Sequence, residues 1–270
     1  MMKNILSCSS HCYSRYSFDR ALAGIVRAGL QYVEVAAVPG HTEHVKPEAM
    51  DRKQMREAGR HIRSFGLEIS GISGHCNLAS SEGTGLFLKR IEFAYENEVK
   101  YVISAEGMIK SEGDKDNFFY NMENIASQAG RRGITVCLET HGGILGNADE
   151  CKKTLERIGS EHVKLNYDPA NLIYFEGRRP ERDMAKAIAH IGYFHIKDKL
   201  EGKGVWNFPA IGDGNIDFKM LLGKLYKNRY DGPLSFEIEF TEKGSGSPEE
   251  VDLAVAKSTA YINNVLRKTV

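Results

Sequence analysis

Four ionisable side chains each follow a short apolar run, and this pattern limits how the chain can fold. They are Glu139, Asp168, His195 and Glu237. Ionisable groups at the ends of buried strands are unfavourable unless they are paired or hold a cation. In parallel α/β folds the carboxyl ends of the strands lie at one edge, where sites form. The pattern therefore predicts buried parallel strands whose ends bring the four residues to one point.

Strand-like runs alternate with helical patterns along the chain. The runs cover residues 4–7, 32–36, 68–73, 101–104, 135–139, 164–168, 192–196 and 235–240. Apolar residues at helical spacing occur over 17–27, 47–65, 118–132 and 248–266. Strands that alternate with helices imply parallel pairing through right-handed crossovers. Eight such units predict an α/β fold, a (β/α)8 TIM barrel, with a doubly wound open sheet as the alternative.

The length of the chain also suits one barrel. Its 270 residues contain no linker, internal repeat or low-complexity segment, so we expect a single domain over residues 1–270. In a TIM barrel, active sites form at the carboxyl ends of the strands. The four ionisable residues would end the last four strands and share one side of the barrel mouth.

Charge and cysteine content restrict the partners and the compartment. The chain has 36 acidic and 36 basic residues and no block of either sign. We therefore expect neither nucleic acid nor a membrane surface as a partner. No apolar run approaches the roughly 18–20 residues of a membrane span, and we expect no signal peptide. The five cysteines lack a Cys-x-x-Cys pair, which favours a reducing, cytoplasmic location.

The four residues suggest a metal site, and neighbouring residues suggest contacts to a substrate. Three carboxylates and one imidazole are a ligand set for a hard-to-borderline divalent cation. Glu239 faces the same side of a strand as Glu237, so it stays an alternative ligand or a partner of the ligands. We predict substrate contacts, with plain structural roles as the alternative, for His75, His141, Lys197 and Trp206.

Five segments carry a resemblance to a known family. They are Leu138-Glu-Thr-His141, 166–172 (NYDPANL), 194–198 (FHIKD), 211–217 (IGDGNID) and 230–237 (YDGPLSFE). In this order they resemble the sugar-phosphate isomerase/epimerase superfamily, the xylose-isomerase-like TIM barrels. Its members include ketose 3-epimerases, inosose isomerases and dehydratases, and endonuclease IV.

The resemblance implies roles for the four residues. Glu139, Asp168, His195 and Glu237 would bind one divalent metal, Mn²⁺ first, with Mg²⁺, Co²⁺ or Zn²⁺ as substitutes. Glu139 and Glu237 would also be the catalytic pair that exchanges a proton with carbon on opposite faces of the substrate. Asn171 stands where related enzymes place a histidine, and we predict that it contacts the substrate. Many members are dimers or tetramers, so a homo-oligomer is expected.

The function implied is a metal-dependent isomerase or epimerase acting on a keto-sugar, sugar or cyclitol. It would abstract a proton next to a carbonyl, through a metal-bound enediolate. A dehydratase or lyase on the same site is the alternative. A nuclease is disfavoured because Asn171 replaces the histidine that binds a second metal in that branch. A non-catalytic sugar-binding barrel is disfavoured because Glu139 and Glu237 are both present.

Overall fold

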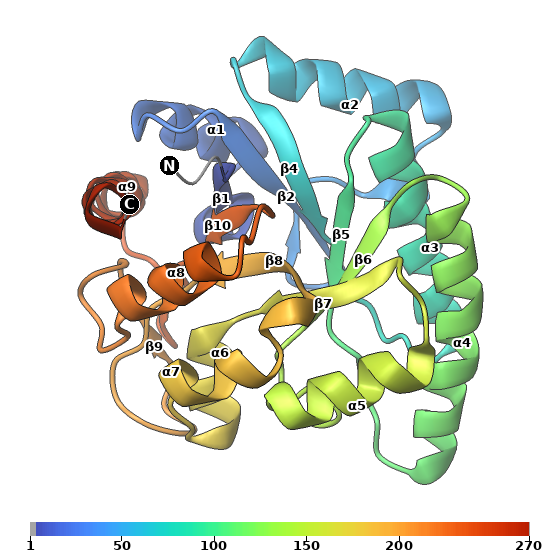
Figure 1. The fold of residues 1–270 in the computed structure, drawn as a ribbon. Helices are drawn as coiled ribbons and strands as arrows, with labels where there is room; N and C mark the ends of the chain where they lie inside the picture. The colour runs from blue at the N-terminus through green and yellow to red at the C-terminus, as the bar shows by residue number, and fades with distance from the viewer. Residues whose placement is uncertain (1–3, 270) are drawn as a thin grey trace.

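Eight parallel strands close into a barrel (Figure 1). The computed structural model describes residues 4–269, so the outermost ends of the expected domain, 1–3 and 270, lie outside the described residues. The barrel strands are β1 (Leu6–Ser9), β2 (Tyr32–Val38), β4 (Glu68–Ser73), β5 (Tyr101–Ser104), β6 (Thr135–Glu139), β7 (Val163–Tyr167), β8 (Ile191–Ile196) and β10 (Leu234–Phe236). β1 pairs with both β10 and β2, which closes the ring. The barrel prediction is confirmed, and the open-sheet alternative is wrong.

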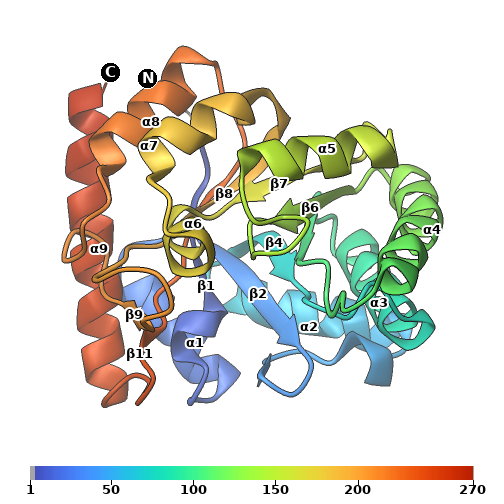
Figure 2. The ribbon, with the colours of Figure 1, turned by 90° about the horizontal axis from the view of Figure 1, so that it is seen from below.

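Helices surround the barrel, with α3 and α4 on one side and α9 on the other (Figure 2). They are α1 (Phe18–Arg27), α2 (Arg52–Ser64), α3 (Ser81–Glu96), α4 (Glu112–Gly130), α5 (Ala148–Ile158), α6 (Pro169–Glu176), α7 (Pro180–Asp183), α8 (Phe218–Lys227) and α9 (Pro248–Thr269). Short 3₁₀ helices are η1 (Ser10–Tyr13), η2 (Pro47–Ala49), η3 (Met184–Lys186) and η4 (Ile188–His190). The remaining strands are β3 (Thr42–Glu43), β9 (Asn207–Phe208) and β11 (Phe240–Thr241). Within residues 4–269, no helix has the length and apolarity that a membrane crossing requires.

Two predicted elements are shorter than expected. The helix expected over 47–65 is split, because Asp51 caps α2 with its side chain and forms a capping box with Gln54. The strand expected over 235–240 ends at Phe236. Phe240 has a φ of 61° and belongs to β11, which pairs with β9 in an antiparallel way. The chain therefore turns away from the barrel directly after Glu237.

The first strand and the fourth helix are shifted from their predicted bounds. The first strand covers Leu6–Ser9 rather than 4–7. The helix expected over 118–132 begins earlier, since the Ser111 side chain accepts a hydrogen bond from Asp114 N and caps α4. Neither shift moves a residue of the predicted site.

Side chains that point into the barrel fill its interior next to the four predicted residues. Residues two apart on a strand face the same side, so Tyr193 and His195 both point inward. The Tyr193 ring packs with Ile103 and Cys137, and its hydroxyl lies 3.1 Å from Ser70 Oγ. The His195 ring lies 5.9 Å from the Tyr193 ring. His195 therefore packs against this layer of side chains inside the barrel.

Candidate active site

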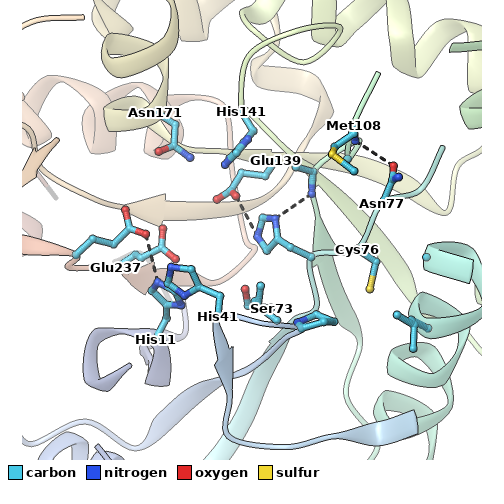
Figure 3. A pocket seen from close by; sticks show the side chains of 18 of the residues that line it. His11, His41, Ser73, Cys76, Asn77, Met108, Glu139, His141, Asn171 and Glu237 are labelled. Carbon is cyan, nitrogen blue, oxygen red and sulfur yellow. Dashed lines mark hydrogen bonds and ion pairs between the residues drawn. The ribbon is translucent and has the colours of Figure 1, made fainter. Parts of the chain in front are cut away.

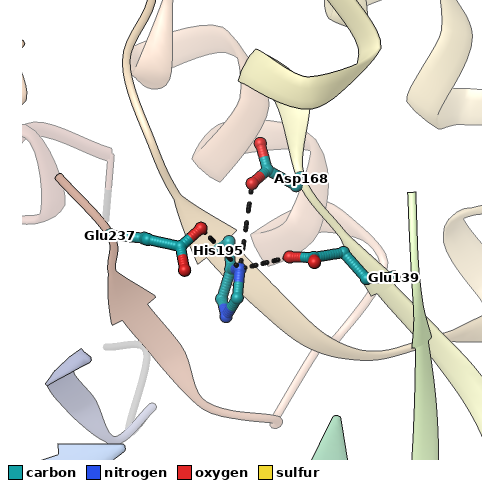
Figure 4. Close-up of side chains that lie close together, drawn as sticks. All are labelled: Glu139, Asp168, His195 and Glu237. Atoms are coloured by element: carbon teal, nitrogen blue, oxygen red, sulfur yellow. Dashed lines mark ion pairs between the residues drawn. The ribbon is translucent and has the colours of Figure 1, made fainter. Parts of the chain in front are cut away.

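The four predicted residues converge at the carboxyl ends of β6, β7, β8 and β10 (Figure 4). His195 Nδ1 lies 2.6 Å from Glu139 Oε1, 3.5 Å from Glu237 Oε2 and 3.8 Å from Asp168 Oδ2. All four side chains are buried. One ligand atom from each lies within 4.8 Å of the others. The predicted convergence is thus present in the fold.

Asp168 is fixed by the helix that follows it. Its Oδ1 accepts hydrogen bonds from Ala170 N at 2.8 Å and Asn171 N at 2.9 Å, and so caps α6. Pro169 occupies the first helical position, where its missing N–H is not needed. The cap uses one carboxylate oxygen only. The other oxygen, Oδ2, is buried and makes no hydrogen bond.

Glu34, which was not among the predicted site residues, orients His195. Its Oε2 lies 3.0 Å from His195 Nε2, and both side chains are fully buried. A hydrogen bond from Nε2–H to Glu34 points Nδ1 at the three other carboxylates, where its lone pair would bind a cation in place of the second ring proton. Histidines that bind metals commonly donate their second N–H to such a carboxylate. The available signal was one charged residue inside the apolar run Tyr32–Val38.

The site fits a divalent cation. Asp168 Oδ2 is buried and makes no hydrogen bond, and it lies 3.8 Å from His195 Nδ1. Glu139 is held in place by Asn166 Nδ2, 3.1 Å from its Oε1, and by His75 Nε2, 3.2 Å from its Oε2. A cation among these atoms would give each of them a partner and offset the charge of the carboxylates.

Lys197 connects Glu237 of the four-residue cluster to Glu239 and Asn171. Its ammonium lies 3.0 Å from Glu237 Oε2, 2.5 Å from Glu239 Oε2 and 3.2 Å from Asn171 Oδ1. Glu239 Oε1 lies 3.2 Å from His11 Nε2. Glu239 is therefore a partner of Lys197 and His11, outside the cluster around His195. His11, Glu237 and Glu239 could form a second cation site, but the Lys197 ammonium already contacts both carboxylates.

The pKa values of the two glutamates in the cluster are shifted in opposite directions. Burial raises the pKa of Glu139 to about 7, although the His195 cation opposes this shift. Burial also acts to raise the pKa of Glu237, but Lys197 and His195 outweigh it and hold that pKa well below its ordinary range. Burial lowers the pKa of His75 to about 3, so its imidazole is neutral at pH 7.

A cavity of about 650 Å³ opens over the cluster (Figure 3). Its lining includes all five predicted substrate contacts, namely His75, His141, Asn171, Lys197 and Trp206. The His141 ring lies 4.6 Å from that of Phe175. The Trp206 ring meets Tyr174 edge-on at 5.6 Å. The structure thus brings these residues to one cavity beside the predicted metal ligands.

The glycine-rich segment 211–217 shapes the active-site face. The Asp198 carboxylate accepts hydrogen bonds from the backbone of Gly212, Gly214 and Ile216 at 2.9–3.2 Å. A Cβ on Gly214 would lie 2.1 Å from Asp198 Oδ1. The motif thus binds an internal carboxylate and fixes the chain that follows β8.

Glu106 is, like Glu34, a buried carboxylate outside the predicted site residues. It follows β5 by two residues and is 6% exposed. Burial raises its pKa to about 7. Its Oε2 is buried without a hydrogen-bond partner. The available signal was again an acidic residue just after an apolar strand.

Comparisons with known proteins agree with the fold. Residues 22–258 match the model of the xylose isomerase-like TIM barrel family. The chain is 26% identical over 196 residues to an inosose dehydratase from Histophilus somni (strain 129Pt), covering 66% of this chain and 60% of that protein. It is 25% identical over 235 residues to an L-ribulose 3-epimerase from Methylomonas sp. (strain DH-1), covering 81% and 77%.

Solved structures show the same fold. A xylose isomerase-like TIM barrel protein from Mycobacterium smegmatis, solved in complex with magnesium, matches with a TM-score of 0.78. The match covers 99% of this chain and 98% of that one at 16% sequence identity. At this identity the likeness is one of fold alone.

Proposed function

Because the chain belongs to the xylose isomerase-like TIM barrel family, we propose that it is an isomerase or epimerase of a keto-sugar or keto-cyclitol. One observation carries the proposal. Glu139 and Glu237 reach the cluster from opposite sides of His195 (Figure 4). Two carboxylates placed in this way can address both faces of one carbon atom. Two relatives of the chain, an inosose dehydratase and an L-ribulose 3-epimerase, support a substrate of this class.

The proposed reaction moves a proton on a carbon next to a carbonyl. One of the two glutamates takes the proton, and the other returns a proton to the opposite face, which inverts the centre. Glu237 is held ionised by Lys197, so its carboxylate carries no proton before the reaction. Glu139 has the raised pKa of a group that can carry one.

We propose that Glu139, Asp168, His195 and Glu237 hold one divalent cation, with Mn²⁺ as the first choice and Mg²⁺, Co²⁺ or Zn²⁺ as alternatives. When bound, such an ion supplies Lewis-acid polarisation of a carbonyl oxygen. Two observations support this assignment: Asp168 Oδ2 is buried without a hydrogen-bond partner, and one ligand atom from each of the four residues lies within 4.8 Å of the others. The five lining residues His75, His141, Asn171, Lys197 and Trp206 are proposed to contact hydroxyl groups or the ring of the substrate.

A dehydratase on the same site is the second candidate. The His141 ring lies 6.0 Å from that of His75, which itself contacts Glu139. An imidazole at this place could protonate a leaving hydroxyl group after Glu139 has removed the proton from the neighbouring carbon. Burial lowers the pKa of His141, so this role would need the ring to be protonated in the complex.

Proton NMR in D2O distinguishes the two reactions. The Mn²⁺-loaded protein is incubated with a panel of ketoses, inososes and 3-keto-glycosides. Solvent deuterium in an unchanged carbon skeleton, or a new epimer, would support the isomerase or epimerase. An unsaturated product that has lost water would assign the dehydratase instead.

Two variants test the catalytic pair. Glu139→Gln and Glu237→Gln should each lower the exchange rate by about 10²–10⁴-fold, the range of a general base. Glu123→Gln, an exposed position on α4, is the matched control and should retain the rate of the unaltered protein. Full exchange activity in Glu139→Gln would refute the proposal.

A further inference from the structure

The cavity extends well beyond the four residues proposed to hold a metal ion. Figure 3 shows Cys76, Asn77 and Met108 on the side of the cavity opposite Glu237. We call this region the side arm and define it by the lining residues Val38, Pro39, Cys76, Asn77, Ser80, Leu86 and Met108. They come from the end of β2, from the segments after β2, β4 and β5, and from α3. None of them belongs to the proposed catalytic or metal-binding set.

The cavity is larger than one sugar ring. A six-carbon keto-sugar occupies about 200 Å³, on the order of six or seven waters at roughly 30 Å³ each. The cavity measures about 650 Å³. A ring placed against the cluster would therefore leave the side arm unfilled. The remaining space is sufficient for a second group of comparable size.

Two side-chain oxygens of the side arm, Asn77 Oδ1 and Ser80 Oγ, are already used within the protein. Asn77 Oδ1 accepts a hydrogen bond from Met108 N at 3.0 Å. Ser80 Oγ donates to Asn77 O at 3.0 Å and accepts from Gly83 N at 3.0 Å. Most of the surface that remains for a ligand is apolar, because Val38, Pro39, Leu86 and Met108 line it.

Two glycines keep the wall of the side arm closely packed. A Cβ on Gly107, whose φ is 88°, would lie 2.5 Å from Asn77 Oδ1 and Asn77 Cα. A Cβ on Gly83 would lie 2.1 Å from Asn77 O. The 74–80 loop is thus locked between α3 and the segment after β5. A preformed wall lowers the ordering cost of binding.

The charged residues that line the cavity disfavour a phosphate group in the side arm. Among the lining residues of the cavity, Lys197 is the only lysine or arginine. It is already paired with Glu237 and Glu239. The carboxylate at the edge of the side arm, Glu82, would repel an anion.

We propose that the side arm is a subsite for an uncharged apolar substituent, so that the substrate is a keto-sugar glycoside with an aryl or alkyl group. This inference rests on the proposed function, since the keto-sugar ring is placed at the cluster. Burial of the substituent against Leu86 and Met108 supplies the preference through the hydrophobic effect. A free monosaccharide would leave this surface uncovered.

The test measures binding separately from turnover. Methyl and phenyl β-D-glucopyranoside have no ketone and cannot lose the proton that the reaction requires. Their affinities for the Mn²⁺-loaded protein are measured by calorimetry and by the fluorescence of Trp206, the only tryptophan. The phenyl glucoside should bind at least tenfold more tightly. Equal affinities, or no binding of either compound, would overturn the subsite.

Matched variants locate the preference. Met108→Asp places a charge in the side arm, and Met220→Asp places one on α8; both methionines are exposed, so neither change disturbs the core. The phenyl preference should fall below threefold in Met108→Asp and stay at tenfold in Met220→Asp. A tenfold preference in Met108→Asp would reject the side arm. Deuterium exchange into the 3-keto forms of both glucosides tests the proposed function separately, so phenyl preference without exchange would reject that function and retain the subsite.

Discussion

Glu34 Oε2 lies 3.0 Å from His195 Nε2, across the barrel from β2 to β8, in a region without solvent contact. A carboxylate in this place can only accept a hydrogen bond, so Nε2 carries the proton. Nδ1 faces Glu139, Asp168 and Glu237, and its lone pair would bind a cation placed among them. One buried residue thus selects the tautomer that a metal ligand requires.

Glu34→Gln should weaken metal binding by about 10–100-fold, the range for a lost carboxylate partner of a ligating histidine. The amide of glutamine can donate to Nε2 and so place the proton on Nδ1, where it would repel a cation. Calorimetric titration of Mn²⁺ into the metal-free variant measures the change. Glu68→Gln, on the exposed start of β4, is the control and should bind Mn²⁺ as the unaltered protein does. Unchanged affinity in Glu34→Gln would show that Glu34 has a structural role only.

The sequence predicted the barrel and the convergence of the four residues because each signal is local. An apolar run followed by Asp168 or His195 is visible in the chain itself, and the parallel fold dictates that such ends meet. Glu34 lies in the middle of a strand, and its partner is 161 positions away. Its role depends on barrel closure and on which side of β2 faces inward, neither of which a single run reveals. The early end of β10 likewise depends on the pairing of β11 with β9.

Mn²⁺ should stabilise the folded protein. At a free concentration 100-fold above Kd, a ligand that binds only the folded state adds about 2.7 kcal/mol, and Tm should rise by about 5–10 °C. Asp168→Asn should lose most of this increase, because asparagine keeps the cap on α6 but removes the charge of a ligand. Thermal unfolding is recorded with Mn²⁺ and with EDTA. Equal Tm values of the unaltered protein under both conditions would contradict the proposed metal site.

Lys197→Met should destabilise the metal-free protein by about 3–5 kcal/mol at pH 7, the range for removing one partner of a buried ion pair. Glu237 and Glu239 would be left buried with one fewer cation between them. Urea unfolding measures the free energy. Lys46→Met removes an exposed lysine that pairs with Glu43, and it should leave the midpoint unchanged. If the two variants unfolded at the same urea concentration, the Lys197 network would have no stabilising role.

Glu106 should make stability fall with rising pH. Burial raises its folded pKa to about 7, whereas an unfolded glutamate titrates near 4.3. Between these values the folded state binds more protons, so its stability decreases as the pH rises through this window, and the full penalty is present above pH 7.

Glu106→Gln should therefore be more stable than the unaltered protein by about 1–3 kcal/mol at pH 8 and equally stable at pH 4.5. Urea unfolding of the metal-free proteins at pH 4.5, 6 and 8 gives the difference at each pH, which cancels groups common to both chains. Glu123→Gln, at an exposed position on α4, should show no such trend. A difference that is the same at all three pH values would mean that the Glu106 carboxyl does not titrate in this window. In that case the packing of the side chain against the backbone of Gly143 would be the cause instead, because a Cβ there would lie 2.5 Å from Glu106 Oε1.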